Sequence, residues 1–131
     1  MNNNTLLLRQ INPSFLKLNR PTSQAFRPTP KDEYNLSVYD GDKIKSEPAW
    51  EHFTGQLNFA SVGVMGITVE ECTELDLSAR SDPVPFLEHA IIDFSSFSKN
   101  QIEKKARKLQ EKAVARGWLY QATASQVGGG R

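Results

Sequence analysis

The chain has 131 residues, of which 38% are hydrophobic and 24% are charged, and its net charge is +1. This length and composition are typical of one globular domain that buries its own core. The single cysteine, Cys72, excludes an internal disulfide, argues against a structural zinc site and favours a reducing compartment, which we expect to be the cytoplasm. We expect no signal peptide, because the start MNNNTLLLRQI has no basic region and only a brief apolar run. We expect no membrane span, because no apolar run approaches the required ~20 residues.

The first predicted strand covers residues 5–11. Asn12-Pro13 ends it, because the residue before proline is pushed away from the helical region of backbone space. A short helical turn over residues 14–18 follows.

The stretch Arg20–Asp42 is polar and contains three prolines, which exclude a central strand before the short strand expected at Leu36–Tyr39. We expect Phe26 and Tyr34 to pin this stretch to the core. Two interpretations stay open: a solvated surface connector, or a stiff loop that binds a partner or ligand. In the second, Arg20, Arg27 and Lys31 would hold an anion, Ser23 would donate a hydrogen bond, and Asp32 or Glu33 would act as acid or base.

The middle of the chain predicts a short helix and a buried strand. Ser46 is the expected N-cap of the helix, and Ala49, Trp50, Phe53 and Leu57 recur at helical spacing. The apolar run 59–69 predicts a central strand, in which Gly63 and Gly66 mark a bulge or a close approach. Thr68 to Glu71 has the capping-box pattern and predicts another short helix to about residue 75.

The C-terminal third predicts a loop over 77–85, a strand over 89–94, a long helix over 99–116 and a strand over 118–121. Ser98 and Gln101 form a second capping-box pattern, and Ile102, Ala106, Leu109 and Ala113 line one helical face. Strand, helix and strand in this order predict a closing βαβ unit. We therefore expect one α+β domain over residues 1–121, with a mixed sheet of about five strands, and a flexible Gly-rich tail over 122–131.

The long helix is strongly basic. Residues 99–116 carry seven basic and two acidic side chains, while residues 1–98 carry an excess of acidic ones. Lys104, Lys105 and Lys108 are candidate binding residues, either for the phosphates of a nucleic acid or for an acidic protein partner, unless the face is simply solvated. An aromatic platform among these charges is missing, so a protein partner is favoured.

No group of residues has the spacing of a metal site. Asp40-Gly41-Asp42 resembles the start of a calcium loop but lacks the later ligands, and is expected to be a turn. His52, His89 and Cys72 do not have metal-ligand spacing, and each histidine is interpreted as a surface or half-buried residue. Cys72 lies among glutamates, which raise the pKa of a thiol, so it is expected to be structural.

Two family resemblances can be stated. The strings LLLRQI-NPSF, TSQAFRPTPKDE and LSVYDGD resemble a family of small uncharacterised bacterial proteins, which implies a bacterial cytoplasmic protein and no particular activity. The order Arg9, Ser23, Glu88 is similar to that of ADP-ribosyltransferases, in which an arginine ends the first strand and a glutamate lies at a strand edge. That resemblance implies NAD as cofactor, held by Arg9, with Glu88 stabilising the oxocarbenium charge. The Ser-Thr-Ser motif and the second glutamate of that family are absent.

The C-terminal Gly128-Gly-Gly-Arg131 resembles the tail of ubiquitin-like modifier precursors, which implies conjugation after trimming. Because no catalytic constellation is visible, the favoured hypothesis is a non-enzymatic bacterial accessory or adaptor protein. It would bind another protein in a multi-gene system and need no cofactor. The NAD-using enzyme and the ubiquitin-like modifier are the alternatives.

Overall fold

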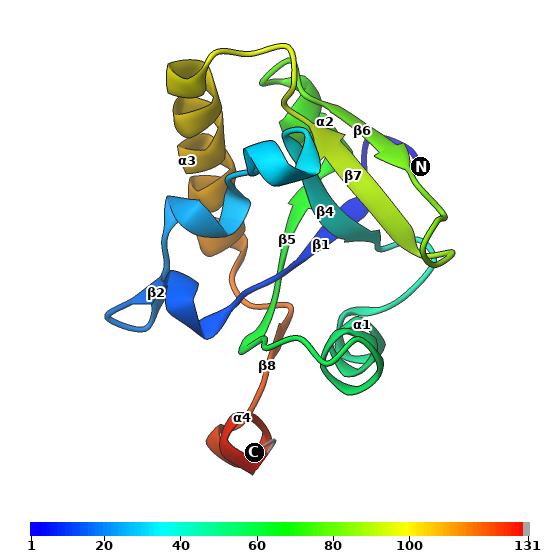
Figure 1. The fold of residues 1–131 in the computed structure, drawn as a ribbon, viewed down its shortest axis with the longest axis vertical. Helices are drawn as coiled ribbons and strands as arrows, with labels where there is room; N and C mark the ends of the chain where they lie inside the picture. The colour runs from blue at the N-terminus through cyan, green and yellow to red at the C-terminus, as the bar shows by residue number, and fades with distance from the viewer. Residues whose placement is uncertain (130–131) are drawn as a thin grey trace.

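The fold is built around one sheet whose strands lie in the order β6-β7-β4-β1-β5-β8 (Figure 1). The structure is a computed structural model that describes residues 1–129. In chain order, the six strands are β1 (Leu6–Gln10), β4 (Asn35–Asp40), β5 (Gly63–Thr68), β6 (Ser78–Ser81), β7 (His89–Asp93) and β8 (Tyr120–Gln121). A separate small ribbon pairs β2 (Leu16–Lys17) with β3 (Arg20–Pro21).

The predicted α+β class is confirmed, but the strand pairing differs from a mixed sheet. Every hydrogen-bonded pair in the six-stranded sheet is antiparallel. The predicted βαβ unit is nevertheless present, because β7 precedes the long helix in the chain, β8 follows it, and the two strands run in the same direction. They form no parallel ladder because β4, β1 and β5 lie between them.

The helices begin largely where the capping patterns predicted. Thr68 caps α2 (Val69–Thr73) and Ser98 caps α3 (Lys99–Arg116), each through a complete capping box. The first helix, α1 (Ser46–Glu51), has Lys45 rather than Ser46 at its N-cap, and it continues into a π-helical turn, η4 (His52–Gln56). Three short 3₁₀ turns precede them, namely η1 (Pro13–Phe15), η2 (Ser23–Phe26) and η3 (Pro30–Asp32).

The face of the sheet toward α3 holds the larger core. The predicted helix face of Ile102, Ala106, Leu109 and Ala113 is buried there, which confirms the amphipathic pattern. It packs against Leu7 and Ile11 of the β1 segment, Ile67 of β5 and Phe26 of η2, all fully buried. The opposite face holds a smaller core of Leu8, Tyr39, Ala49 and Val64, covered by α1 and η4. In Figure 1, α3 and α1 accordingly lie on opposite sides of the sheet.

Two predicted segments have a different structure, and a third contains a short helix. The loop expected over 77–85 contains β6, an edge strand whose residues alternate too weakly to be recognised. The turn expected over 14–18 is instead η1 followed by β2, which pairs with β3. The predicted tail 122–131 contains a short helix, α4 (Ala124–Gly129), and Gly130 and Arg131 lie outside the described residues.

The two glycines of β5 are places of close approach, as their positions predicted. A Cβ atom on Gly63 would lie 2.5 Å from the carbonyl oxygen of Tyr120, and one on Gly66 would lie 2.6 Å from a methyl carbon of Leu119. These contacts let β8 and the residue before it pack directly on β5. They therefore help to place the end of α3 against the sheet.

Candidate functional site

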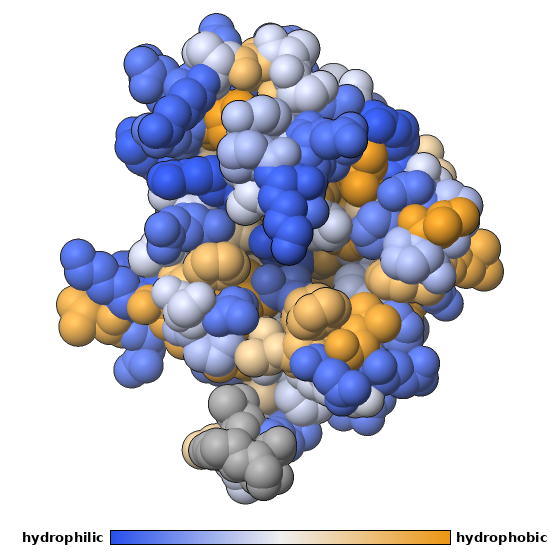
Figure 2. All heavy atoms as spheres, in the orientation of Figure 1, coloured by the Kyte–Doolittle hydropathy of each residue, from blue (hydrophilic) through white to orange (hydrophobic). Residues whose placement is uncertain are grey.

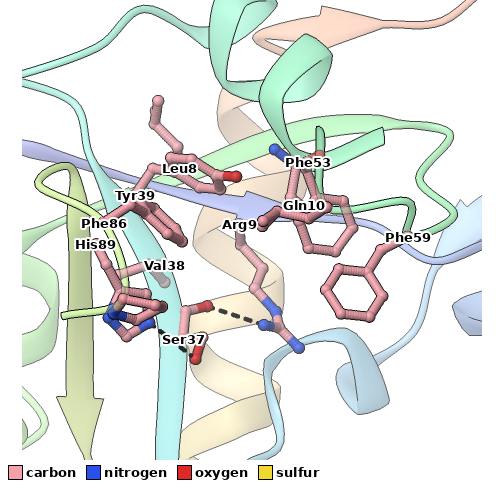
Figure 3. Close-up of a pocket in the computed structure, with 12 residues that line it drawn as sticks. Leu8, Arg9, Gln10, Ser37, Val38, Tyr39, Phe53, Phe59, Phe86 and His89 are labelled. Carbon is pink, nitrogen blue, oxygen red and sulfur yellow. Dashed lines mark hydrogen bonds between the residues drawn. The ribbon is translucent and has the colours of Figure 1, made fainter. Parts of the chain in front are cut away.

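A pocket of about 250 Å³ opens on the α1 face of the sheet. Its lining comes from β1, β4, the η4 segment, the turn before β7, and β7 itself, and it includes Leu8, Ser37, Tyr39, Phe53, Phe86 and His89 (Figure 3). Sites for drug-sized ligands occupy roughly 300–1,000 Å³. The pocket is therefore of a size for one ring or one large side chain rather than for a whole dinucleotide.

The pocket lies where the two central strands separate. β1 pairs with β4 only at Leu7 and Leu8, although it pairs with β5 along its whole length. β4 in turn pairs with β7 from Asn35 to Tyr39. The first half of β4 thus has no backbone partner on the β1 side, and this opening creates the space.

Arg9 lies in this opening. Its Nε donates a hydrogen bond to Ala25 O at 2.7 Å, and its Nη1 donates one to Ser37 O at 2.8 Å. The guanidinium thereby takes the place of the missing backbone donor opposite Ser37, and it ties η2 to β4. Figure 3 shows it directed from β1 toward Ser37, at the edge of the pocket.

Burial lowers the pKa of the Arg9 guanidinium to about 10, and the nearby Asp32 carboxylate acts in the opposite direction. Neutral pH lies more than two units below this pKa, so the side chain is a cation there. A partly buried cation beside an apolar pocket attracts an acceptor group on whatever occupies that pocket.

Aromatic rings form one wall of the pocket. The Phe86 ring lies 5.1 Å from the Tyr39 ring, 4.6 Å from the His52 ring and 5.2 Å from the His89 ring, measured between centroids. The Tyr39 hydroxyl is also 2.7 Å from Nδ1 of His52. Burial, with a smaller effect of Glu88, raises the pKa of Tyr39 above its ordinary value, so this hydroxyl keeps its proton.

Ser37 and His89 are polar residues of the pocket wall, and Asp82 contacts His89 from outside the lining; we call these three the serine–histidine–aspartate group. The Ser37 hydroxyl lies 3.2 Å from Nε2 of His89. Nδ1 of His89 lies 2.9 Å from Asp82 O and 3.3 Å from Asp82 Oδ2. The register of β4 and β7 brings this about, because Tyr39 is opposite His89 and Ser37 is the next residue along on the same face.

Exposed apolar side chains occur in the pocket lining and next to it in the sequence. Phe59, which lines it, is 57% exposed, and Val84 and Leu87, on either side of the lining residues Pro85 and Phe86, are 78% and 64% exposed. Figure 2 shows hydrophobic surface over α1 and at the right-hand edge, where the β6–β7 connection lies. Surface of this kind around a pocket is typical of an interaction site.

The stretch Arg20–Asp42 divides between the core and the surface. Ala25 and Phe26 are fully buried against α3, so Phe26 pins the stretch as predicted, whereas Tyr34 is 37% exposed and does not. Among the predicted binding residues of this stretch, Arg20, Lys31, Asp32 and Glu33 are exposed, and Ser23 and Arg27 are partly buried. None of these residues lines the pocket. Asp32 affects the site only through its charge, which raises the pKa of Arg9.

The three residues of the ADP-ribosyltransferase hypothesis do not meet in the pocket. Arg9 lines it, but Ser23 begins η2, which packs against α3 on the other face. Glu88 directly precedes His89 and is not part of the lining. Arg9 is thus the one predicted catalytic residue that belongs to this site.

The basic helix residues differ from one another. Lys105 donates a hydrogen bond to Leu75 O at 2.6 Å and lies 4.1 Å from the centre of the Phe97 ring. Lys104 is exposed, and Lys108 is exposed with Glu111 3.9 Å away. Lys105 therefore has a structural role, and the solvated basic face is carried by its neighbours.

The sequence analysis did not identify Ser37, Phe86 or Asp82, and it interpreted His89 as an isolated histidine. The alternation in Leu36–Tyr39 does place Ser37 and Tyr39 on one face, which is the one local signal for this site. The pairing of β4 with β7, which brings His89 beside them, has no local signal.

Comparison of the chain with protein-family models, with curated proteins and with solved structures finds no match. The site is therefore interpreted from its own geometry. Among residues 1–129, no helix has the length and apolar composition needed to cross a membrane. Within that same range, no three His, Cys, Asp or Glu side chains are grouped so as to hold a metal ion.

Proposed function

We propose that this chain is a small accessory protein that binds another protein, and that the pocket receives one aromatic or large apolar side chain of that partner. The observation that carries the proposal is the combination of an aromatic-walled pocket of about 250 Å³ with exposed apolar residues around it. Anchors of protein interfaces are typically aromatic side chains that fill such pockets, surrounded by contacts that exclude water.

The charge of Arg9 supports a further feature of the partner. The guanidinium already donates to two carbonyl oxygens, and it stays cationic at neutral pH. A partner segment with a carboxylate next to its aromatic residue would be favoured over one with a lysine or arginine there. The proposed recognition element is therefore an acidic, aromatic segment.

The proposed setting is the bacterial cytoplasm, within a multi-gene system. The supporting observations are the single cysteine, which is buried, and the resemblance of three strings in the chain to small bacterial proteins. Burial, with a contribution from Glu71, raises the pKa of the Cys72 thiol to about 12, which makes it unreactive.

Site-specific photocrosslinking tests this proposal. A photoreactive phenylalanine analogue is placed at Phe59, in the pocket lining, and in a control at Leu18, which is 90% exposed in the turn between β2 and β3. In host cells we expect one crosslinked protein from position 59 that is absent from position 18. Mass spectrometry then identifies the crosslinked segment of the partner.

The identified segment gives the decisive measurement. Replacing its aromatic residue with alanine should weaken binding at least about tenfold, which is the size of an ordinary interface anchor. The proposal is wrong if positions 59 and 18 give the same products, or if the crosslinked segment has no aromatic or large apolar residue.

A further inference from the structure

The serine–histidine–aspartate group has an arrangement that partner binding does not require. Nδ1 of His89 has two oxygens of Asp82 as its neighbours, at 2.9 and 3.3 Å, so this nitrogen carries the proton. In the neutral imidazole Nε2 is then the acceptor, and the Ser37 hydroxyl lies 3.2 Å from it as the donor. The imidazole is therefore held in the tautomer that can take a proton from Ser37.

The exposure of these side chains suits a reaction at Ser37. Ser37 is exposed and lines the pocket, while only 11% of the His89 side chain is exposed. The hydroxyl is thus open to a ligand, and the base behind it is largely shielded from water by Phe86 and the turn that carries Asp82. A base that is fixed by a second group and contacts an accessible hydroxyl is the usual arrangement of an activated nucleophile.

A reaction at Ser37 also needs a place for the substrate and a group that stabilises negative charge. The pocket supplies the first and Arg9 the second. The aromatic wall gives a place for an apolar group beside Ser37, and Arg9 is a cation bonded to the carbonyl oxygen of the same residue. Figure 3 shows the guanidinium and the Ser37 side chain bordering the same space. A cation in this position would stabilise negative charge that develops on a carbonyl oxygen attacked by Ser37.

We propose that Ser37 is a nucleophile that transfers the acyl group of a small ester with an apolar or aromatic substituent, with His89 as general base. Ser37 Oγ bonds to the ester carbonyl carbon as its proton moves to Nε2 of His89. The tetrahedral intermediate then breaks its bond to the alcohol oxygen, and the alcohol leaves with that proton. Water, activated by His89 in the same way, releases the acid and restores Ser37.

This activity goes beyond the proposed function, because it needs no protein partner. The free protein should hydrolyse an ester, and an ester-splitting protein need not bind a partner segment. The two proposals therefore fail independently of one another.

The first experiment labels the folded protein with a fluorophosphonate and locates the adduct by mass spectrometry. We expect Ser37 to be labelled at least 100-fold faster than Ser81, an exposed serine on β6 whose hydroxyl contacts Lys43 rather than a histidine. The same comparison is made in urea, where the difference should vanish. Equal labelling of Ser37 and Ser81 in the folded protein overturns the proposal, and no variant is needed for that outcome.

The second experiment follows the release of p-nitrophenol from p-nitrophenyl butyrate. Turnover by the wild type should exceed the buffer rate, and Ser37→Ala and His89→Gln should each lower it by at least 100-fold, as expected for loss of a nucleophile or a general base. Ser81→Ala is the matched control and should keep the wild-type rate. Turnover that survives Ser37→Ala contradicts the proposal.

Asp82 is a positioning residue in this scheme, since it acts through His89. Asp82→Asn should lower kcat about tenfold and leave KM unchanged, because the carbonyl oxygen of residue 82 still accepts from Nδ1. Asp82→Glu should recover part of the loss. An equal change of kcat in both variants would exclude a role for the carboxylate.

Discussion

The two faces of the central sheet are built differently. The α3 face is covered by an eighteen-residue helix and by η2, and its core includes the fully buried Phe26 and Phe94. The α1 face is covered by a short helix and a π-helical turn, and its buried core has four residues. One face is closed by large side chains, whereas the other leaves a pocket with Phe59 and His89 in its lining.

We expect the closed face to determine mainly the stability of the protein and the open face to determine mainly what it binds. The closed face holds the larger buried core, and burial of apolar area is the dominant favourable contribution to folding. The open face keeps aromatic rings, the Arg9 cation and the Ser37 hydroxyl in the lining of a pocket, at the opening between β1 and β4. Substitutions on the closed face should therefore change the free energy of unfolding most, and substitutions on the open face should mainly change binding or turnover.

The largest effect is expected from truncating a phenylalanine on the closed face. Phe26→Ala removes a fully buried ring and should lower the free energy of unfolding by about 3–5 kcal/mol. The matched change on the open face, Phe59→Ala, removes a ring that is 57% exposed and should cost less than ~1 kcal/mol. Urea denaturation measures both. Equal losses would contradict the division between the two faces.

Arg9 should have the next largest effect, because it joins the two faces. Arg9→Met keeps most of the apolar side chain but leaves Ala25 O and Ser37 O without this donor. The free energy of unfolding should therefore fall by about 1–3 kcal/mol. Hydrogen exchange should then speed up in η2 and in the first half of β4. The control Arg20→Met changes an exposed arginine, and its free energy of unfolding should stay within ~0.5 kcal/mol of the wild-type value.

A smaller, pH-dependent effect is expected at the pair of Glu71 and Arg116, which form two hydrogen bonds of 3.0 and 2.9 Å. Burial alone would raise the pKa of Glu71, but the bonds from Arg116 and from the Thr68 amide outweigh it, and the pKa lies below the ordinary 4.5. The unfolded state therefore binds the proton more readily, so this stabilisation is present above pH 4.5 and is lost as the pH falls through the lower, folded pKa.

Glu71→Gln should reveal this dependence. At pH 7 the variant should be less stable than the wild type by about 1–2 kcal/mol, and the difference should shrink as the pH falls below 4.5. Urea denaturation across this range measures it. A difference that grows toward low pH would contradict the sign.

The smallest effect on stability is expected at the basic face of α3. Lys104→Glu together with Lys108→Glu changes exposed residues and should alter the free energy of unfolding by less than ~0.5 kcal/mol. Because α3 and the pocket lie on opposite faces, the crosslinks from position 59 should also persist. Loss of those crosslinks would place the basic face within the partner interface.

Local patterns in the sequence were sufficient for the parts of the fold that depend on neighbours in the chain. Both capping boxes, the buried stripe of α3 and the strands β1, β4, β5 and β7 follow from spacing over a few residues. β6 was missed because a short edge strand needs no strong alternation, and it is defined by its pairing with β7. The π-helical turn after α1 was missed for a similar reason, since helical spacing alone does not separate it from an α-helix.

The candidate site depended on tertiary structure almost entirely. The sequence by itself determined that Arg9 lies near the end of the first strand, that Ser37 and Tyr39 share one face, and that Phe53 lies on a helix. Only the pairing of β4 with β7 and the separation of β4 from β1 decided that these residues meet His89 and Phe86 in one pocket. The physical reason is that capping and helical packing join residues three or four apart, whereas the register of β4 with β7 joins residues fifty or more apart and is selected by burial of the whole sheet.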